Sequence, residues 1–178
     1  MAEKLDLEPD CASCLGLCCA ATGFEKSDQY AFAKPAGDPC RLLQRDFRCG
    51  IHNELGEKGM TGCDLYTCFG AGQNVSQHLF PGLDWRRSPD TAQEVFDTFY
   101  KLKELHELIW VLRLTLSACA DGPERDKVAE RIAEVESKAH LDAAATQALD
   151  LNALRRGSQS AIDGVHWNVT IGRKGEQG

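Results

Sequence analysis

The segment Cys11-Ala-Ser-Cys14-Leu-Gly-Leu-Cys18-Cys19 decides how this chain of 178 residues is expected to fold. It opens a cysteine-rich region, and only Cys119 of the nine cysteines lies outside that region. The region contains Cys11, Cys14, Cys18, Cys19, Cys40, Cys49, Cys63 and Cys68. Such a density of thiols is typical either of disulfides or of thiolates that bind soft metal ions.

The expected cellular compartment distinguishes disulfides from thiolates that bind metal. Residues 1–10 have neither the apolar core nor the basic start of a secretory signal, and no apolar run approaches the length of a membrane span. We therefore expect a cytoplasmic protein, whose reduced thiols favour metal binding or redox activity over a disulfide framework. The net charge of -7 and the lack of a basic patch predict neither nucleic acid nor membrane as a partner.

The chain divides into three parts, which we expect to form one compact domain. Residues 1–87 are rich in glycine and poor in clustered aliphatic side chains, so a bound metal would have to supply folding energy. Residues 88–156 show helical periodicity, and residues 157–178 form a C-terminal tail. The expected fold is mainly α with irregular loops: a metal-stabilised cysteine-rich part packed on a long antiparallel helical hairpin.

Helix signals define the hairpin. Ser88-Pro89-Asp90 predicts a helix start, and Asp121-Gly-Pro-Glu124 predicts a break before a second helix. We expect the second helix to continue, straight or kinked, to about Leu154. The first helix has an apolar stripe of Val95, Phe96, Phe99, Leu102, Leu105, Ile109, Leu112 and Leu116. In the tail, apolar residues alternate from Val165 to Ile171, which fits either a short strand or a tail with Trp167 packed onto the body.

The cysteine spacing suggests more than one metal centre. Cys11, Cys14 and Cys18 would share one face of a helical turn, whereas Cys19 projects elsewhere. Eight thiols could form two four-coordinate sites, or one iron–sulfur cluster with a second metal or a redox pair. The compact first run slightly favours an iron–sulfur cluster over zinc. His52 is either an additional ligand beside Cys49 or a structural or surface histidine.

Two families resemble this pattern. Cys-x2-Cys-x3-Cys-Cys, Pro-Cys-x-x-Leu and Cys-x-Ile-His resemble the YkgJ-like cysteine-cluster proteins, whose signature is one residue shorter. A closer likeness, over about residues 11–115, is to the N-terminal module of actinobacterial pentapeptide-repeat proteins. It rests on Cys14-Leu-Gly-Leu-Cys-Cys19, Phe47-Arg-Cys-Gly-Ile-His52 and Cys68-Phe-Gly-Ala-Gly-Gln73, although the repeats are absent. Both resemblances imply chelation of zinc or iron by the cysteines.

Other polar residues give weaker signals. Gln73, Ser76, Gln77 and His78 could line a substrate pocket or be polar groups of a loop. His106 lacks the helical spacing of a metal site, so we expect it on a helix surface or at an interface. Cys119 is expected to be a small buried residue.

Three functions follow from these patterns. The first is a cytosolic iron–sulfur or zinc protein, with the cysteines as ligands and redox or metal-dependent catalysis on an unknown substrate. The second is an adaptor stapled by zinc, whose helices bind a protein partner or form a homodimer. The third is a thiol redox switch that uses Cys18 and Cys19 with a resolving cysteine.

Overall fold

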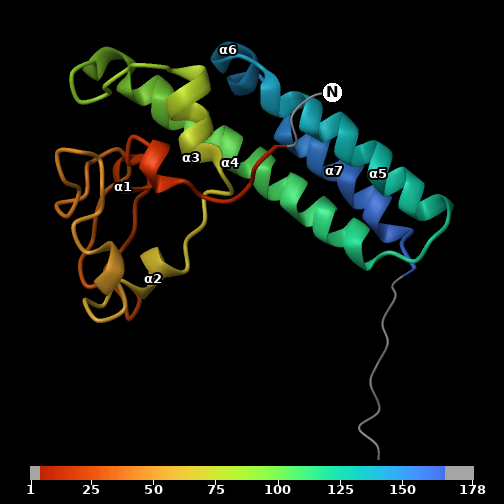
Figure 1. The fold of residues 1–178 in the computed structure, drawn as a ribbon, viewed down its shortest axis with the longest axis horizontal. Helices are drawn as coiled ribbons and strands as arrows, with labels where there is room; N and C mark the ends of the chain where they lie inside the picture. Colours follow the sequence, from red (N-terminus) through yellow and green to blue (C-terminus); the bar gives the residue numbers. More distant parts are fainter. Residues whose placement is uncertain (1–4, 167–178) are drawn as a thin grey trace, which may run out of the picture.

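The computed structural model describes residues 5–166, which form a mainly helical protein (Figure 1). The helices of the second half are α4 (Pro89–Ala118), α5 (Pro123–Glu136), the 3-10 turn η4 (Ser137–His140), α6 (Ala143–Gln147) and α7 (Leu151–Asp163). No β-strand forms within residues 5–166, where three isolated bridges occur in the loops. The expected class, mainly α with irregular loops, is therefore confirmed.

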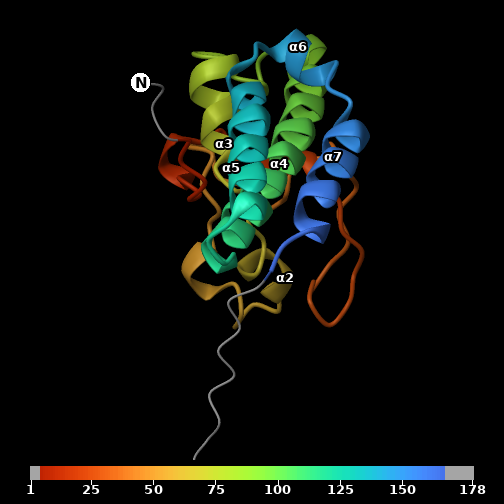
Figure 2. The same ribbon diagram turned by 90° about the vertical axis from the view of Figure 1, so that its right-hand side faces the viewer.

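Helix α4 is the central element of the protein. It begins at Pro89, as the sequence predicts, and its apolar stripe is buried from Val95 to Leu112. The helices α5, α6 and α7 pack against it on one side, whereas α1 and α3 of the cysteine-rich part pack against its first half. Figures 1 and 2 show α4 lying between these two groups.

The second predicted helix is shorter than expected. It ends at Glu136, and in place of the expected kinked continuation to about Leu154 the chain forms the separate elements η4, α6 and α7. Asp142 and Asp150 each accept a hydrogen bond from the backbone three residues later, which starts α6 and α7 as separate helices. Helix α7 then continues past residue 156 and packs against both α4 and α5.

The proposed strand in the tail falls mainly outside the described residues. Val165 is buried, and His166 accepts a backbone hydrogen bond from Ala120. Residues 167–178, which include Trp167, are not described, so the strand stays a prediction.

The cysteine-rich part consists of loops and short helices. These are η1 (Cys11–Ser13), α1 (Leu17–Ala21), η2 (His52–Glu54), α2 (Thr61–Asp64), α3 (Ala71–Asn74) and the π-helical turn η3 (Val75–Leu79). Its buried aliphatic residues, such as Leu17 and Val75, join the core formed around α4. The indole of Trp85 donates a hydrogen bond to the carbonyl of Leu15 (2.9 Å), and Tyr100 of α4 donates one to Ala21 (2.7 Å). These contacts attach the cysteine-rich part to α4.

Candidate metal centre

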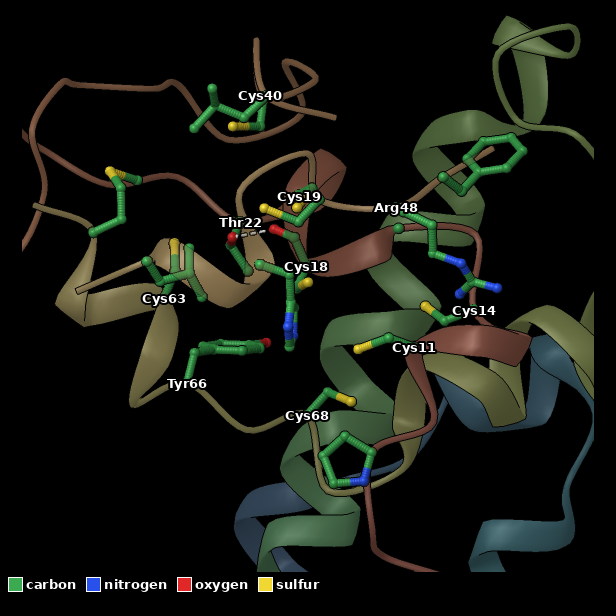
Figure 3. A pocket seen from close by; sticks show the side chains of 18 of the residues that line it. Cys11, Cys14, Cys18, Cys19, Thr22, Cys40, Arg48, Cys63, Tyr66 and Cys68 are labelled. Atoms are coloured by element: carbon green, nitrogen blue, oxygen red, sulfur yellow. Dashed lines mark hydrogen bonds between the residues drawn. The ribbon is translucent and has the colours of Figure 1, made fainter. Parts of the chain in front are cut away.

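All eight cysteines of the N-terminal region line one cavity of about 650 Å³ (Figure 3). The structure forms no disulfide among these eight residues, and Cys11 is the exposed one of the eight. Apolar and aromatic side chains complete the wall, among them Phe24, Leu42, Met60, Tyr66 and Tyr100. Thiols separated by up to 57 positions in sequence therefore face the same space.

The first four cysteines are placed by two local features. Asp10 accepts hydrogen bonds from the Ala12 backbone (2.8 Å) and the Ser13 hydroxyl (2.6 Å), which forms the 3-10 turn that includes Cys11. Gly16 then adopts φ 67°, a left-handed conformation that suits glycine, and α1 begins at the next residue. A Cβ at residue 16 would also lie 2.7 Å from the side chain of Leu43. The turn thus places Cys18 and Cys19 in the first turn of α1, beside the cavity.

Cys68 joins the same wall as Cys14. It precedes the left-handed pair Phe69 and Gly70, which turns the chain into α3. A Cβ at Gly72 would lie 2.8 Å from the Cys14 sulfur and 3.6 Å from the Cys68 sulfur. The bare backbone of Gly72 thus lets both sulfur atoms approach the same point.

The other three cysteines come from the loops opposite. The backbone N–H of Cys40 donates to the carbonyl of Cys19 (2.8 Å), and Cys49 forms an isolated bridge with Leu43. Cys63 lies in α2, where Gly62 lets the ring of Tyr30 pack against the backbone: a Cβ there would lie 2.2 Å from a ring carbon. Backbone contacts therefore bring these cysteines to the side of the cavity where Cys19 lies.

Burial makes these sulfur atoms resistant to ionisation. Burial, together with the charges of neighbouring thiols, raises the pKa of Cys14 and of Cys63 to about 11 each. A hydrogen bond with the Cys19 side chain, followed by burial, raises the pKa of Cys18 well above its usual value. Burial also raises the pKa of Cys68, and hydrogen bonds from the backbone N–H groups of Gly72 and Gly70 partly offset this rise. Thiolates would form together here only with a cation to offset their charge.

Two basic residues that the sequence analysis missed lie beside the thiols. Lys34 is buried, and its ammonium group donates to the carbonyls of Ala20 (3.2 Å), Pro35 (3.1 Å) and Asp38 (2.5 Å). Its charge lowers the pKa of Cys63. No periodicity or spacing marks this lysine, because its position depends on the Phe24–Lys34 bridge.

Arg48 is the second missed residue. One guanidinium nitrogen donates to the carbonyl of Ala12 (2.5 Å), and the other, Nη1, is buried without a hydrogen-bond partner. The guanidinium also lowers the pKa of Cys11. Its adjacency to Cys49 in sequence was the available signal.

The histidines differ in their placement. His52 lies in η2 and lines the thiol cavity. His106 is fully buried in α4, and its Nδ1 lies 2.7 Å from the carbonyl of Phe69, so the expected surface position is wrong. Burial lowers the pKa of His106 to about 4. Cys119 is buried, as predicted.

The polar group after Cys68 does not line the cavity. Gln73 donates to the carbonyl of Glu8 and accepts from Asp10, and Gln77 donates to Ser13. The Ser76 hydroxyl accepts from the backbone of Leu15 and donates to Gly72. These side chains hold the N-terminal segment against α3 and η3, so they are structural groups rather than a substrate pocket.

The donor set fits soft metal ions, because thiolate is the ligand that zinc and iron–sulfur clusters share. In the part of the chain that the structure describes, however, no three Cys, His, Asp or Glu side chains converge closely enough to hold an ion as they stand. The thiols line a common cavity from different walls, and side-chain rotation about χ1 would be needed to bring them to one point.

Comparison with known proteins gives one curated relative. The chain is 45% identical over 136 residues to an uncharacterized protein, YybG, of Bacillus subtilis (strain 168). The match covers 76% of this chain and 49% of YybG, so the chain spans about half the length of that relative. No family model matches the chain, and no solved structure matches it. None of the helices between residues 5 and 166 is long and apolar enough to cross a membrane.

Proposed function

We propose that this protein binds metal through its eight N-terminal cysteines, as a cytoplasmic member of the YkgJ-like cysteine-cluster proteins. The observation that carries the proposal is that all eight thiols line one cavity, although they come from five separate segments of the chain. Burial and mutual repulsion keep these thiols protonated in the absence of metal. A bound metal cation would displace the protons and offset the charge of the thiolates.

An iron–sulfur cluster is preferred over zinc, and both metals suit thiolates. Four of the cysteines come from one short run, residues 11–19, as is common in iron–sulfur sites. Backbone N–H groups of Gly70 and Gly72 also donate to the Cys68 sulfur. Bound metal would also stabilise loops that have little core of their own, and the antiparallel hairpin of α4 and α5 would support them. The close packing of α4 with α5 across a short turn supports this arrangement.

A catalytic role belongs to the same proposal. Bound iron or zinc would supply redox or Lewis-acid chemistry. The chain itself supplies a cavity with aromatic walls, which include Tyr66 and Tyr100, and the unpaired Nη1 of Arg48. These groups would bind and orient a small organic substrate beside the thiols.

The adaptor hypothesis is the second candidate. Trp110 and Leu114 lie one turn apart on α4 and are 44% and 54% exposed, which offers an apolar surface for a partner or a second copy. Light scattering of the full chain tests the homodimer, and a monomer at high concentration would exclude it. The redox switch has less support, because reactive cysteines have lowered pKa values and that of Cys18 is raised.

Metal analysis of anaerobically purified protein tests the first proposal. We expect iron with acid-labile sulfide and broad visible absorbance, or a colourless protein that contains zinc. The Cys14→Ala variant should contain less metal, whereas Cys119→Ala, outside the cavity, should match the wild type. Wild-type protein that carries no metal and takes up neither zinc nor iron under reducing conditions would disprove the proposal.

A further inference from the structure

We infer that the eight thiols form two four-sulfur centres, one of Cys11, Cys14, Cys18 and Cys68 and the other of Cys19, Cys40, Cys49 and Cys63. This inference rests on the proposed metal binding and adds which cysteines share an ion or cluster. Figure 3 shows Cys11, Cys14 and Cys68 on one side of Cys18, with Cys40 and Cys63 on the other.

The first centre is organised around Gly72. The Cys14 and Cys68 sulfurs lie 2.8 and 3.6 Å from the position of its missing Cβ, which places them over one point of α3. Cys11 lies one 3-10 turn before Cys14, whose N–H donates to the carbonyl of Cys11 (3.4 Å). The thiols of Cys11 and Cys14 each interact electrostatically with Cys68. These three thiols therefore face one part of the cavity.

The second centre is organised by the loops that follow α1. The hydrogen bond between Cys40 and Cys19 joins the loop of Cys40 to α1, and the bridge from Leu43 to Cys49 brings Cys49 back to that loop. Cys63 interacts electrostatically with both Cys40 and Cys49, and Cys49 also hydrogen-bonds the side chain of Cys19. After side-chain rotation to a common point, these four thiols would supply the four ligands of one tetrahedral site.

Cys18 completes the first centre. It interacts with thiols on both sides of the cavity, including Cys11, Cys68 and Cys63, so it lies at the junction. The side chains of Cys18 and Cys19 contact each other by a hydrogen bond, so the two centres meet here. We assign Cys19 to the second centre because its carbonyl accepts the backbone hydrogen bond of Cys40. With Cys19 in the second set, Cys18 is the fourth ligand of the first.

Each centre also has its own cation. Arg48 donates a hydrogen bond to the carbonyl of Ala12, beside Cys11 of the first set. Lys34 donates to the carbonyl of Ala20, beside Cys19 of the second. Four thiolates around a divalent ion leave an excess of negative charge, which a basic side chain within the protein offsets. A cation beside each group of thiols is compatible with two centres.

Stepwise metal release from the wild-type chain tests the division. Full-length protein loaded with zinc is titrated anaerobically with a chelator, and newly accessible thiols are alkylated and located by fragment-ion mass spectrometry. We expect two equivalents of zinc per chain. Loss of the first should expose one set of four cysteines together, and loss of the second should expose the other set. A first step that exposes Cys14 with Cys63, or one metal protecting all eight, would overturn the division.

Variants give a second measurement. Cys11→Ala and Cys68→Ala should each lose one zinc, and their combination should lose no more than one. Cys11→Ala with Cys49→Ala should lose both. Loss of both metals from the Cys11/Cys68 pair, with α-helical circular dichroism retained, contradicts the assignment. Wild-type protein that binds no metal disproves the proposed function instead, so the two failures are distinguishable.

Discussion

Replacement of Gly72 by alanine separates a structural role of this glycine from a role in the metal centre. Gly72 is the second residue of α3 and is buried. Alanine is favoured over glycine inside a helix by about 1 kcal/mol, so a purely helical account predicts a more stable protein. The new methyl group would, however, lie 2.8 Å from the Cys14 sulfur, closer than real contacts of this kind allow.

The expected loss of metal affinity depends on whether the clash occurs in the metal-bound or in the metal-free protein. In the metal-free protein the Cys14 thiol can rotate away. The proposed first centre requires it to stay near residue 72 when metal is bound, while the other thiols rotate towards it. Overpacking of this kind costs roughly 1–3 kcal/mol, which corresponds to a roughly 5- to 150-fold weaker affinity for the first metal. The second centre, on the opposite side of Cys18, should keep its affinity.

Competition between the protein and a zinc indicator measures both affinities in one titration. Gly56→Ala is the matched control, because a Cβ there meets nothing within 4 Å. We expect the control to bind as the wild type does, and Gly72→Ala to have one weakened site of two. If Gly72→Ala binds both metals with wild-type affinity, the Cys14 and Cys68 sulfurs do not meet at this glycine in the bound state.

Three further predictions concern the surroundings of the centre. Lys34→Met leaves three backbone carbonyls without their donor, so we expect urea unfolding of the metal-free protein to be easier by roughly 2–3 kcal/mol; an unchanged urea midpoint would show that the lysine is dispensable. Chelation under reducing conditions should make residues 23–68 cleavable by protease while the helical circular dichroism of α4, α5 and α7 persists; equal protection with and without metal would refute metal-dependent order. His106 has its pKa lowered by burial to about 4, so the unfolded state binds the proton first as the pH falls. The neutral, buried His106 side chain contributes fully to the free energy of unfolding above about pH 6.5, and roughly 3 kcal/mol of this free energy is lost as the pH falls towards about 4. The free energy of unfolding of His106→Gln should lack this part of the pH dependence.

Local signals in the sequence were sufficient to predict much of the helical framework. Proline at the first position of α4 and apolar residues every three to four positions identify that helix and its buried face. The caps at Asp142 and Asp150 are local signals too, but the apolar spacing continued across them and concealed the breaks between α5, α6 and α7. Burial of His106 depended on the carbonyl of Phe69, 37 positions earlier in the chain.

The sequence by itself determined that eight thiols lie between residues 11 and 68, because a count of residues needs no structure. Metal binding by these thiols is the proposal built on that count. Only the tertiary structure decided that all eight thiols line one cavity, that Gly72 lets Cys14 and Cys68 come together, and that Lys34 lies buried beside the opposite thiols. The physical reason is that helical periodicity and capping act within a few residues. The meeting of distant loops depends instead on the shape of the core onto which they pack.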